Sequence, residues 1–202
     1  MAVGPGAPFY QTAHWVDKLS ANRQRLCHYL GMRRVLGNSH KKPLPGPNDA
    51  VIYFRNYNTS PWSKVFSVWF TFRRLRAPPF VFFERILTQN KFENIWIVAH
   101  PCQQKHPIVK EIVKKFGAKV HTGNAEEDFQ FISSAQTIIM SPSTYAWWAA
   151  FFSSSTTTVH FPIMPGPLPM DNWCELMMRH TENNRKRFVY HDWQVSLAPR
   201  IE

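Results

Sequence analysis

The stretch 128–163 constrains the fold of this chain more than any other part of its sequence. It opens with the amphipathic run 128–135 and passes through the short apolar run 137–140 and the polar turn 141–144. A second helical run and the strand-like run 157–161 follow. Alternating helical and strand segments are typical of a parallel sheet with helices on its faces. We therefore predict an α/β fold built on a Rossmann-like parallel sheet with helices on both faces.

The turn Ser141-Pro142-Ser143-Thr144 is the part of this stretch that is best suited to bind a ligand. A strand that passes into a helix presents free backbone N–H groups and the positive end of the helix dipole. Ser143 and Thr144 add hydroxyl groups, and Pro142 suits the first helical position, where its missing N–H costs nothing. We therefore predict an anion-binding turn, suited to a phosphate, with Ser143 and Thr144 as its side-chain ligands.

The same stretch resembles the α-1,2-fucosyltransferase family and, more loosely, other nucleotide-sugar-dependent fucosyltransferases. Those proteins carry an aspartate, a few apolar residues, a serine and a β run, followed by a helix start rich in serine and tryptophan. This chain has Asp128 and Ser133 and then Ser143-Thr144-Tyr145-Ala146-Trp147-Trp148, in the same order. The close resemblance covers about a sixth of the chain. It implies the C-terminal, donor-binding half of a GT-B-type glycosyltransferase.

The run 50–56, AVIYFRN, reads as the first convincing strand. The corresponding strand of the resembled family ends in H-x-R-R-x-D, and its first arginine contacts the diphosphate of the donor. Tyr53, Arg55 and Asn56 stand here at the positions of the histidine and the two arginines. An arginine at the C-terminal end of a strand in an open α/β sheet can bind a phosphate bidentately. We expect Arg55 to bind the diphosphate and Tyr53 and Asn56 to contact the nucleotide. The missing second arginine leaves the donor open between GDP- and UDP-linked sugars.

Two residues are candidates for the catalytic base. His100 ends the predicted strand 94–100, where the resembled family has S-D-D, and a neutral imidazole can accept a proton near pH 7. A histidine that caps a loop is the alternative. Asp128 stands where the wider group of fucosyltransferases has an aspartate that holds the nucleobase, so it is a nucleotide-binding candidate as well. The alternative for Asp128 is a helix cap, because Glu126 and Glu127 beside it suit the positive end of a helix dipole.

Aromatic and basic side chains alternate between Trp62 and Arg76. Such a segment can pack on the core, form a surface for a sugar acceptor, or stack on the bases of single-stranded nucleic acid. As an acceptor surface, we single out Trp62, Trp69 and Arg73. Trp147 and Trp148 follow the polar turn on a helix, and we predict that they belong to the core.

Periodicity and turn residues predict the remaining elements. Helices are expected at 14–32, at 80–91 after Pro79, at 106–117 with Gly117 as its C-cap, and at 171–180; strands are expected at 118–122 and 188–194. The apolar faces of the two central helices are predicted as Phe80, Phe83, Ile86 and Leu87, and as Ile108, Ile112, Val113 and Phe116.

Composition and charge place the chain among globular, anion-binding proteins. Its 202 residues are 44% hydrophobic and 15% aromatic, which argues against disorder. Residues 1–91 hold 14 Lys and Arg against 3 acidic residues, whereas the rest holds 10 of each sign. The first half is therefore suited to a nucleotide diphosphate, a nucleic acid or an acidic membrane surface. We divide the chain into an N-terminal helix with a Pro-rich linker at 1–49, a remnant of an acceptor domain on one interpretation, and a nucleotide-sugar-binding domain at 50–202.

Several classes of site lack support in the sequence. Cys27, Cys102 and Cys174 are odd in number and show no C-x-x-C spacing, so reduced thiols are expected. Neither an 18-residue apolar run nor the apolar region of a signal peptide is evident, so we expect a soluble chain, cytoplasmic, or Golgi-associated as a fragment of a longer protein. There is no D-x-D, H-E-x-x-H, G-x-G-x-x-G or G-K-[ST] motif. We expect no metal and no cofactor besides the nucleotide-sugar substrate.

Together these predictions describe a glycosyltransferase that moves a sugar from a nucleotide-sugar to a glycan acceptor. The resemblance implies inversion at the anomeric carbon without a metal ion. Two other hypotheses stay open. In the first, the chain is a non-catalytic sugar- or nucleotide-binding module or a truncated transferase, because the resembled family has a whole domain before the strand that corresponds to 50–56. Alternatively it is a basic RNA-binding protein, but that leaves the pattern at 128–163 unexplained. We expect no nucleic-acid partner, and a minimised transferase would form a homo-oligomer.

Overall fold

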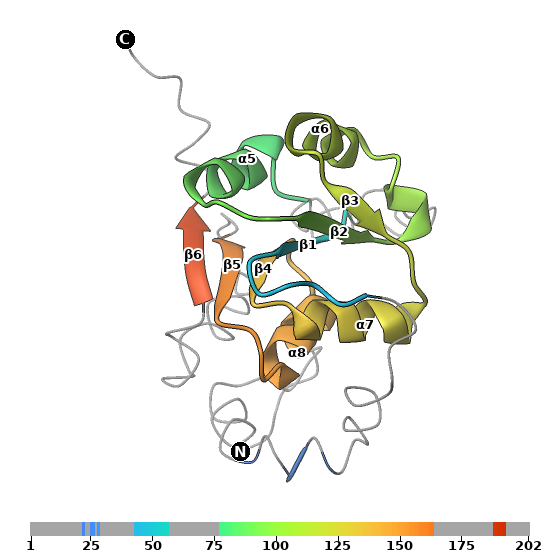
Figure 1. Cartoon of the computed structure of the whole chain (residues 1–202), viewed down its shortest axis with the longest axis vertical. Coiled ribbons are helices and arrows are strands. Elements are labelled where there is room, and N and C mark those ends of the chain that lie inside the picture. Colours follow the sequence, from blue (N-terminus) through green and yellow to red (C-terminus); the bar gives the residue numbers. More distant parts are fainter. Residues whose placement is uncertain are drawn as a thin grey trace, which may run out of the picture.

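A computed structural model describes residues 43–56, 77–163 and 188–192, together with residues 22, 25, 26 and 28. Figure 1 shows one sheet lying between two layers of helices. The elements in chain order are β1 (Ala50–Phe54), α5 (Phe80–Gln89), β2 (Ile95–Ala99), the short 3-10 helix η3 (Pro101–Gln103), α6 (Pro107–Phe116), β3 (Lys119–His121), α7 (Ala125–Ser134), β4 (Thr137–Met140), α8 (Thr144–Phe152), β5 (Thr158–Ile163) and β6 (Phe188–Asp192).

The six strands found in the described part of the chain are parallel and follow the order β3-β2-β1-β4-β5-β6. This is the strand order of a doubly wound nucleotide-binding fold. Helices α5 and α6 cover one face of the sheet, and α7 and α8 cover the other (Figure 1). The chain leaves β1 toward β2 on one side and leaves β4 toward β5 on the other. The boundary between β1 and β4 is therefore the point where the strand order reverses, and the predicted Rossmann-like fold is confirmed.

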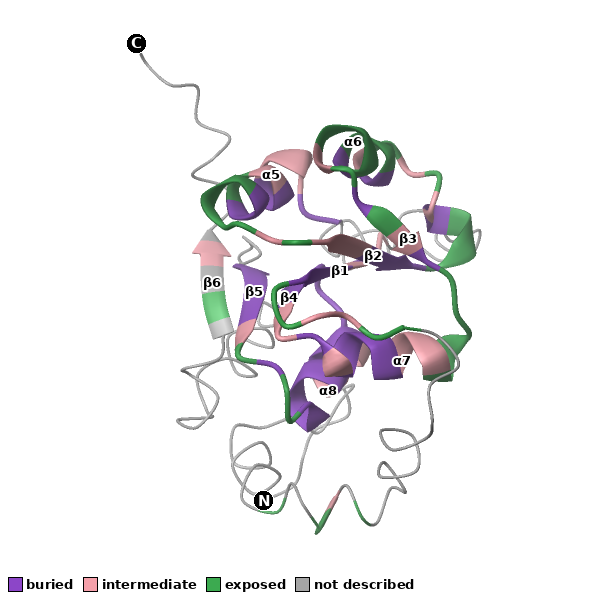
Figure 2. Cartoon of the chain, viewed as in Figure 1, coloured by how far each residue is buried: buried purple, intermediate pink, exposed green. Residues whose placement is uncertain are grey.

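Alternation along the central strand directs side chains into two separate cores. Ala50, Ile52 and Phe54 lie in the cluster under α5 and α6, whereas Val51 and Tyr53 lie in the cluster with α7 and α8. Figure 2 shows the buried residues concentrated along the central strands and on α8. A strand buried on both faces cannot slip by one residue without exchanging its two sets of side chains, so the register that aligns the strand ends is well specified.

Asp49 fixes the amino ends of β1 and β2. The residue is 3% exposed, and its carboxylate accepts hydrogen bonds from Gly46 N at 2.9 Å, Asn94 N at 3.1 Å, Asn94 Nδ2 at 2.9 Å and Trp96 Nε1 at 3.0 Å. Burial by itself raises the pKa of a carboxyl group, but the hydrogen bonds from Asn94, Gly46 and Trp96 outweigh it and lower the pKa of Asp49. The amino edge of the sheet is thus held by a charged acceptor with several donors.

The edge strand β6 is joined to β5 by two imidazoles. His160 Nδ1 and His191 Nε2 are 2.9 Å apart, and the ring of Phe82 on α5 meets His191 edge-on at a centroid distance of 5.7 Å. Burial first, and the neighbouring His191 second, lower the pKa of His160 to about 4. Burial and the charge of Arg85 lower the pKa of His191 as well. The contact between β5 and β6 therefore depends on rings that stay neutral at physiological pH.

Most predicted elements are confirmed, with small shifts at their ends. Helix α7 begins at Ala125 and not at Asp128, because Asn124 and Glu127 form a capping box there. Gly117 is the left-handed C-cap of α6, with φ 66°, as predicted. Trp147 is buried and Trp148 packs against the core, which also agrees with the prediction.

The predicted inner faces of the two helices on the other layer need correction. On α6 the prediction of Val113 as an inward residue is wrong, because Val113 is 37% exposed and Val109 is buried in its place. On α5, Phe82 is buried as well, and Phe80 is only partly covered. The predicted helix 171–180 lies outside the described residues, and so does most of the predicted helix 14–32. Leu26, one of its few described residues, packs against the α7 and α8 core. The division at residue 49 stays a prediction.

Candidate functional site

The carboxyl edge of the sheet holds every predicted site residue that the structure describes. Arg55 and Asn56 follow β1, His100 follows β2, and Ser143 and Thr144 follow β4. Asp128 lies in the first turn of α7, which starts from the same edge. Ligands of open α/β sheets bind in the crevice outside the carboxyl ends of the strands, at the point where the strand order reverses.

Arg55 and the Ser143/Thr144 turn lie on either side of that reversal point. Strands β1 and β4 pair directly, with Tyr53 opposite Met140. Ser141 N then donates to Tyr53 O at 2.9 Å, so the pairing continues past the end of β4. The residues that follow these two strands are therefore neighbours. Arg55 and Ser143 lie at the same carboxyl edge of the sheet, beside the same pair of strands. Opposite edges of the sheet would have separated the two.

Ser143 acts as the N-cap of α8. Its Oγ accepts from Ala146 N at 3.5 Å, and its backbone oxygen accepts from Trp147 N at 3.0 Å. The backbone amides of Thr144 and Tyr145 come before Ala146 and Trp147 in the first turn. They have no partner within the helix, because no helical carbonyl lies one turn before them. They give the start of α8 the partial positive charge that favours an anion. The Ser143 hydroxyl is thus used as a cap, and the backbone amides are the groups best placed for a phosphate.

Ser141 is a residue of this turn that sequence reasoning did not single out. Its side chain is 0% exposed, and its Oγ has no hydrogen-bond partner among the residues that the structure describes. A buried hydroxyl without a partner costs free energy and commonly marks a place where a water or a ligand completes the structure. The polar turn pattern contained Ser141, but only the packing of β1 against β4 shows that its hydroxyl is enclosed.

Asn56 is held firmly by the segment after β2. Two hydrogen bonds fix its backbone: Asn56 N donates to Gln103 Oε1 at 2.9 Å, and Gln103 Nε2 donates to Asn56 O at 2.6 Å. The side-chain amide lies 3.0 Å from His106 Nε2. His106 Nδ1 accepts from Ile108 N at 3.3 Å, and burial lowers the pKa of His106, so the neutral ring carries its proton on Nε2. The predicted nucleotide contact of Asn56 remains a prediction.

His100 is exposed and caps a short helix. Its Nδ1 accepts from Cys102 N at 3.4 Å and lies 2.9 Å from Cys102 Sγ, at the N-terminus of η3. The capping alternative for His100 is thus observed. Its role as a base stays a prediction. Cys102 is an exposed free thiol, which agrees with the expected reduced state.

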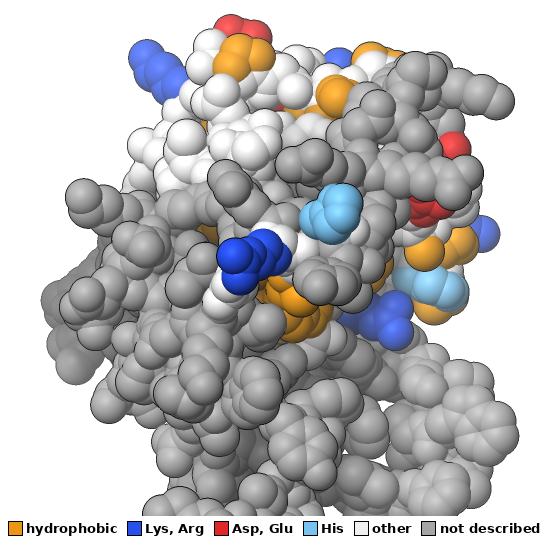
Figure 3. Space-filling view, turned by 90° about the horizontal axis from the view of Figure 1, so that it is seen from below, with side chains coloured by type: hydrophobic (Ala, Val, Ile, Leu, Met, Phe, Trp, Pro, Cys, Tyr) orange, Lys and Arg blue, Asp and Glu red, His pale blue; other side chains and the backbone are white. Residues whose placement is uncertain are grey.

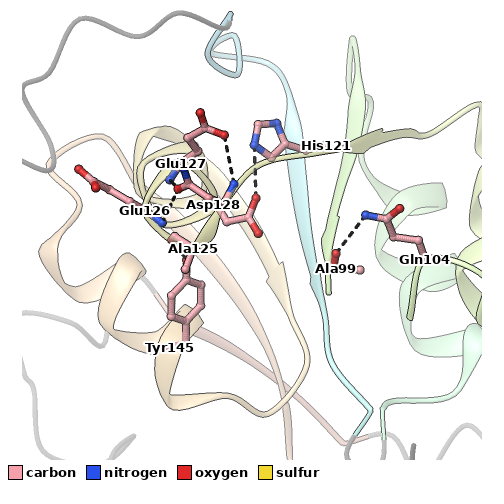
Figure 4. Close-up of polar contacts among 9 residues, drawn as sticks. Ala99, Gln104, His121, Ala125, Glu126, Glu127, Asp128 and Tyr145 are labelled. Carbon is pink, nitrogen blue, oxygen red and sulfur yellow. Dashed lines mark hydrogen bonds and ion pairs between the residues drawn. The ribbon is translucent and has the colours of Figure 1, made fainter. Parts of the chain in front are cut away.

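Asp128 faces His121 in the first turn of α7, and Tyr145 lies against Ala125 at the start of the same helix (Figure 4). Asp128 Oδ1 lies 3.5 Å from His121 Nε2, and the Tyr145 hydroxyl donates to Ala125 O. Burial, followed by the charges of Asp128 and Tyr53, raises the pKa of Tyr145. The cap of α7 is supplied by Asn124 and Glu127, so the alternative of Asp128 as a helix cap is not observed. His121 was not predicted as a site residue.

Partly buried aromatic rings surround this carboxylate on the α7 and α8 side. Tyr53 and Tyr145 have ring centroids 5.7 Å apart, and Phe129 meets Tyr145 edge-on at 5.5 Å. These rings connect the end of β1 to the starts of α7 and α8. An aromatic surface beside a carboxylate has the chemistry to hold a flat heterocycle with N–H donors.

The predicted acceptor residues Trp62, Trp69 and Arg73 lie outside the described residues. Among those that are described, no group of three or more His, Cys, Asp or Glu side chains is arranged to hold a metal ion. None of the described helices has the length and apolar character needed to cross a membrane. On the face drawn in Figure 3, the described basic side chains stand apart from one another and form no continuous stripe.

The fold and this edge define a Rossmann-like α/β protein in which helix α8 starts at the strand-order reversal. Residues 103–190 match the family model for glycosyl transferase family 11, the α-1,2-fucosyltransferase family. The resemblance in sequence is thereby confirmed over that range, and it supports a glycosyltransferase. The range contains Asp128, Ser143 and Thr144 and begins after Arg55 and His100. Neither a curated protein nor a solved structure matches the chain.

Proposed function

We propose that this chain binds a nucleoside-diphosphate sugar at the carboxyl edge of its sheet and transfers the sugar to a hydroxyl group of a glycan acceptor. The observation that supports the proposal most is the pairing of β1 with β4 inside a chain that matches glycosyl transferase family 11. That pairing makes Arg55 and the start of α8 neighbours at the reversal point. One diphosphate can then be contacted by a guanidinium from one strand end and by backbone amides from the other.

The chemistry is a single displacement at the anomeric carbon. The acceptor oxygen forms a bond to that carbon while the bond to the diphosphate oxygen breaks, and the acceptor proton passes to a base. A single displacement inverts the configuration, as the resemblance implies. Arg55 and the amides of Thr144 and Tyr145 stabilise the negative charge that develops on the departing diphosphate, which is the role that positive charge plays in such reactions. In this proposal they do so without a metal ion.

The base is proposed to be His100 or Asp128. His100 is exposed at the edge, and its Nδ1 accepts from the Cys102 amide as a cap. A neutral ring with that cap carries its proton on Nε2, so His100 can take the acceptor proton only after Nδ1 is released from Cys102 N. Asp128 has the alternative role of contacting the nucleobase, together with Tyr53. GDP is the favoured nucleotide, because guanine presents two adjacent N–H donors to one carboxylate, whereas uracil presents one.

The test is the thermal stability of the purified chain with nucleotides at fixed salt. A ligand that binds only the folded state raises the midpoint, by about 2.7 kcal/mol of stabilisation at a hundred times its Kd. We expect GDP and GDP-sugars to stabilise the protein more than UDP and UDP-sugars. Arg55→Gln should lose about tenfold or more in affinity, equivalent to about 1.4 kcal/mol or more. Arg85→Gln, an exposed arginine on α5, is the matched control and should retain it. Equal stabilisation of the wild type and Arg55→Gln would contradict the proposal.

A non-catalytic nucleotide-binding module is the second candidate. The observation in its favour is Asn56, which replaces the second arginine of the family and has its amide at 3.0 Å from His106. One cation fewer weakens the stabilisation of the leaving diphosphate, while Arg55 and the amides at the start of α8 are still present to bind it. Mass-spectrometric detection of sugar transfer or donor hydrolysis by the nucleotide-binding protein separates the two. Binding without turnover, across a panel of glycan acceptors, would favour the module.

A further inference from the structure

The side chains of a histidine and an aspartate lie close together at the turn between β3 and α7. His121 ends β3, and Asp128 lies in the first turn of α7. His121 Nε2 lies 3.5 Å from Asp128 Oδ1, and the two side chains are 7% and 20% exposed. The carboxylate is thus enclosed but not sealed, and an imidazole is one of the groups that enclose it.

The imidazole is held in place by its other neighbours. It stacks on Phe131 with a centroid distance of 4.0 Å and an interplanar angle of 18°. Phe131 is 2% exposed, so the ring rests on a rigid part of the core. The stacking fixes the plane of the imidazole, and with it the direction in which Nε2 points toward α7. His121 is therefore a rigid partner for Asp128.

Gly123 allows the two side chains to approach each other. A Cβ at this position would lie 2.8 Å from Asp128 Oδ1 and 2.9 Å from His121 Nε2. Distances this short between a side-chain carbon and a polar atom are repulsive, so any larger residue would displace the carboxylate, the imidazole or the turn. The turn between β3 and α7 accommodates the contact only because this position is glycine.

The other described titratable groups beside Asp128 do not supply positive charge. Glu127 accepts from Asn124 N at 3.1 Å as part of the capping box. Tyr145, on α8, has its pKa raised by burial and by the charge of Asp128, and Tyr53 on β1 lies beside Tyr145. Among the residues whose contacts with Asp128 the structure describes, His121 is the group that can present an N–H or a positive charge to the carboxylate. Either one favours the ionised form of a partly buried acid.

We propose that His121 is a positioning residue for Asp128, which it keeps ionised and oriented toward the ligand at the carboxyl edge. The role of the ligand rests on the proposed function, whereas the effect on the carboxylate does not. An ionised, fixed Asp128 can accept hydrogen bonds from N–H groups of a nucleobase. A protonated carboxyl group presents an O–H in place of an acceptor, and a rotated carboxylate points its oxygens elsewhere, so either change loses the contact.

The test begins with the free protein and needs no ligand. The carboxyl carbon of Asp128 is followed by NMR over a pH titration and assigned with Asp128→Asn. His121→Phe keeps an aromatic ring against Phe131 but removes the nitrogen that faces the carboxylate. We expect the pH at which Asp128 titrates to rise by about one unit in this variant, a tenfold change in its ionisation constant. An unchanged titration would overturn the proposal.

Nucleotide binding supplies the second measurement. As the pH is lowered toward the midpoint measured for Asp128, His121→Phe should bind the nucleoside diphosphate progressively more weakly than the wild type, and the part of this loss that comes from ionisation approaches about tenfold only below that midpoint. At about pH 8 the difference should shrink to the part that comes from orientation. His121→Gln retains an N–H donor and should restore part of the affinity at both ends of this pH range. It also replaces His121→Phe in this comparison if that variant does not fold. A constant ratio between wild type and both variants over this pH range would contradict the proposed role.

The two proposals fail in different ways. A wild-type protein that binds no nucleoside diphosphate refutes the proposed function, and the titration of Asp128 in the free protein still decides the role of His121. A wild type that binds GDP, with variants at His121 that titrate and bind as it does, refutes the positioning role alone. His100→Gln is a matched control, because it changes an exposed histidine on the same edge and should leave the titration of Asp128 unchanged.

Discussion

The stability of this protein should fall as the pH is lowered, and the His160–His191 pair should be responsible for a defined part of the loss. The pKa of His160 is lowered from its usual 6.5 to about 4 in the folded protein. Between those two values the unfolded chain binds a proton at this residue and the folded protein does not. The free energy of unfolding therefore rises with pH in this range. The contribution of His160 is complete above about pH 6.5 and is lost as the pH falls toward 4.

The size of the loss follows from the shift in pKa. Each pKa unit corresponds to about 1.36 kcal/mol, so a shift from 6.5 to about 4 corresponds to about 3 kcal/mol. Because the ring retains some access to water, we expect about 2 kcal/mol. His191 has its pKa lowered in the same direction, by burial and by Arg85, and adds to the effect. If one of the two rings is protonated, it can still donate to the other across the 2.9 Å contact. If both are protonated, His160 Nδ1 and His191 Nε2 each carry an N–H and repel each other, which would separate β6 from β5.

Urea unfolding followed by tryptophan fluorescence at about pH 7.5 and about pH 4.5 measures this loss, with the linear extrapolation giving the free energy at each pH. His160→Gln cannot titrate, so its loss of stability between the two pH values should be smaller than that of the wild type by about 2 kcal/mol. His100→Gln is the control, because it removes an exposed histidine and should keep the wild-type pH dependence. If His160→Gln loses as much stability as the wild type, the low pKa assigned to the pair is wrong.

Two further predictions concern the sheet and its connections. Asp49→Ala should destabilise the protein by about 3–5 kcal/mol in chemical denaturation, because the buried donors on Asn94 and Trp96 would lose a charged acceptor. The exposed neighbour Asn48→Ala should cost less than about 0.5 kcal/mol, and similar losses for the two variants would contradict the role given to Asp49. Gly117→Ala should cost about 1 kcal/mol, purely from the backbone conformation, because φ is 66° and no atom lies within 4 Å of the added Cβ. A cost near zero in thermal unfolding would show that α6 can end without a left-handed residue.

Local patterns in the sequence were sufficient for the sheet. Short apolar runs bounded by turn residues predicted β1, β2 and β4, because a strand covered on both faces must be apolar throughout. The α7 start was mispredicted although its signal was present, since Asn124 and Glu127 have the spacing of a capping box. Val113 was assigned to the wrong side of α6 because it borders the apolar stripe, and only the packed sheet decides which borderline residue is covered.

The positions of the candidate site residues in the fold could be predicted only where the end of a single strand is recognisable from the sequence. Arg55 and the Ser143/Thr144 turn were placed at strand ends by their neighbours in the chain, and the strand order then made them adjacent. His121 and Ser141 could not be found in this way. His121 ends a strand of three residues, and its contact with Asp128 depends on a turn in three dimensions. Ser141 is distinctive only because its hydroxyl is enclosed without a partner among the described residues.

The direct pairing of β1 with β4 has a consequence for how this protein acquires activity. Val51 and Ile138 face each other across that pair although more than eighty positions of chain separate them. Contacts between such remote parts of a polypeptide form slowly, because the long intervening loop must first be closed. A refolding experiment should therefore recover helix signals before nucleotide affinity. The proposed nucleotide-binding edge of the sheet would be the last feature to form, and a reporter of complete assembly.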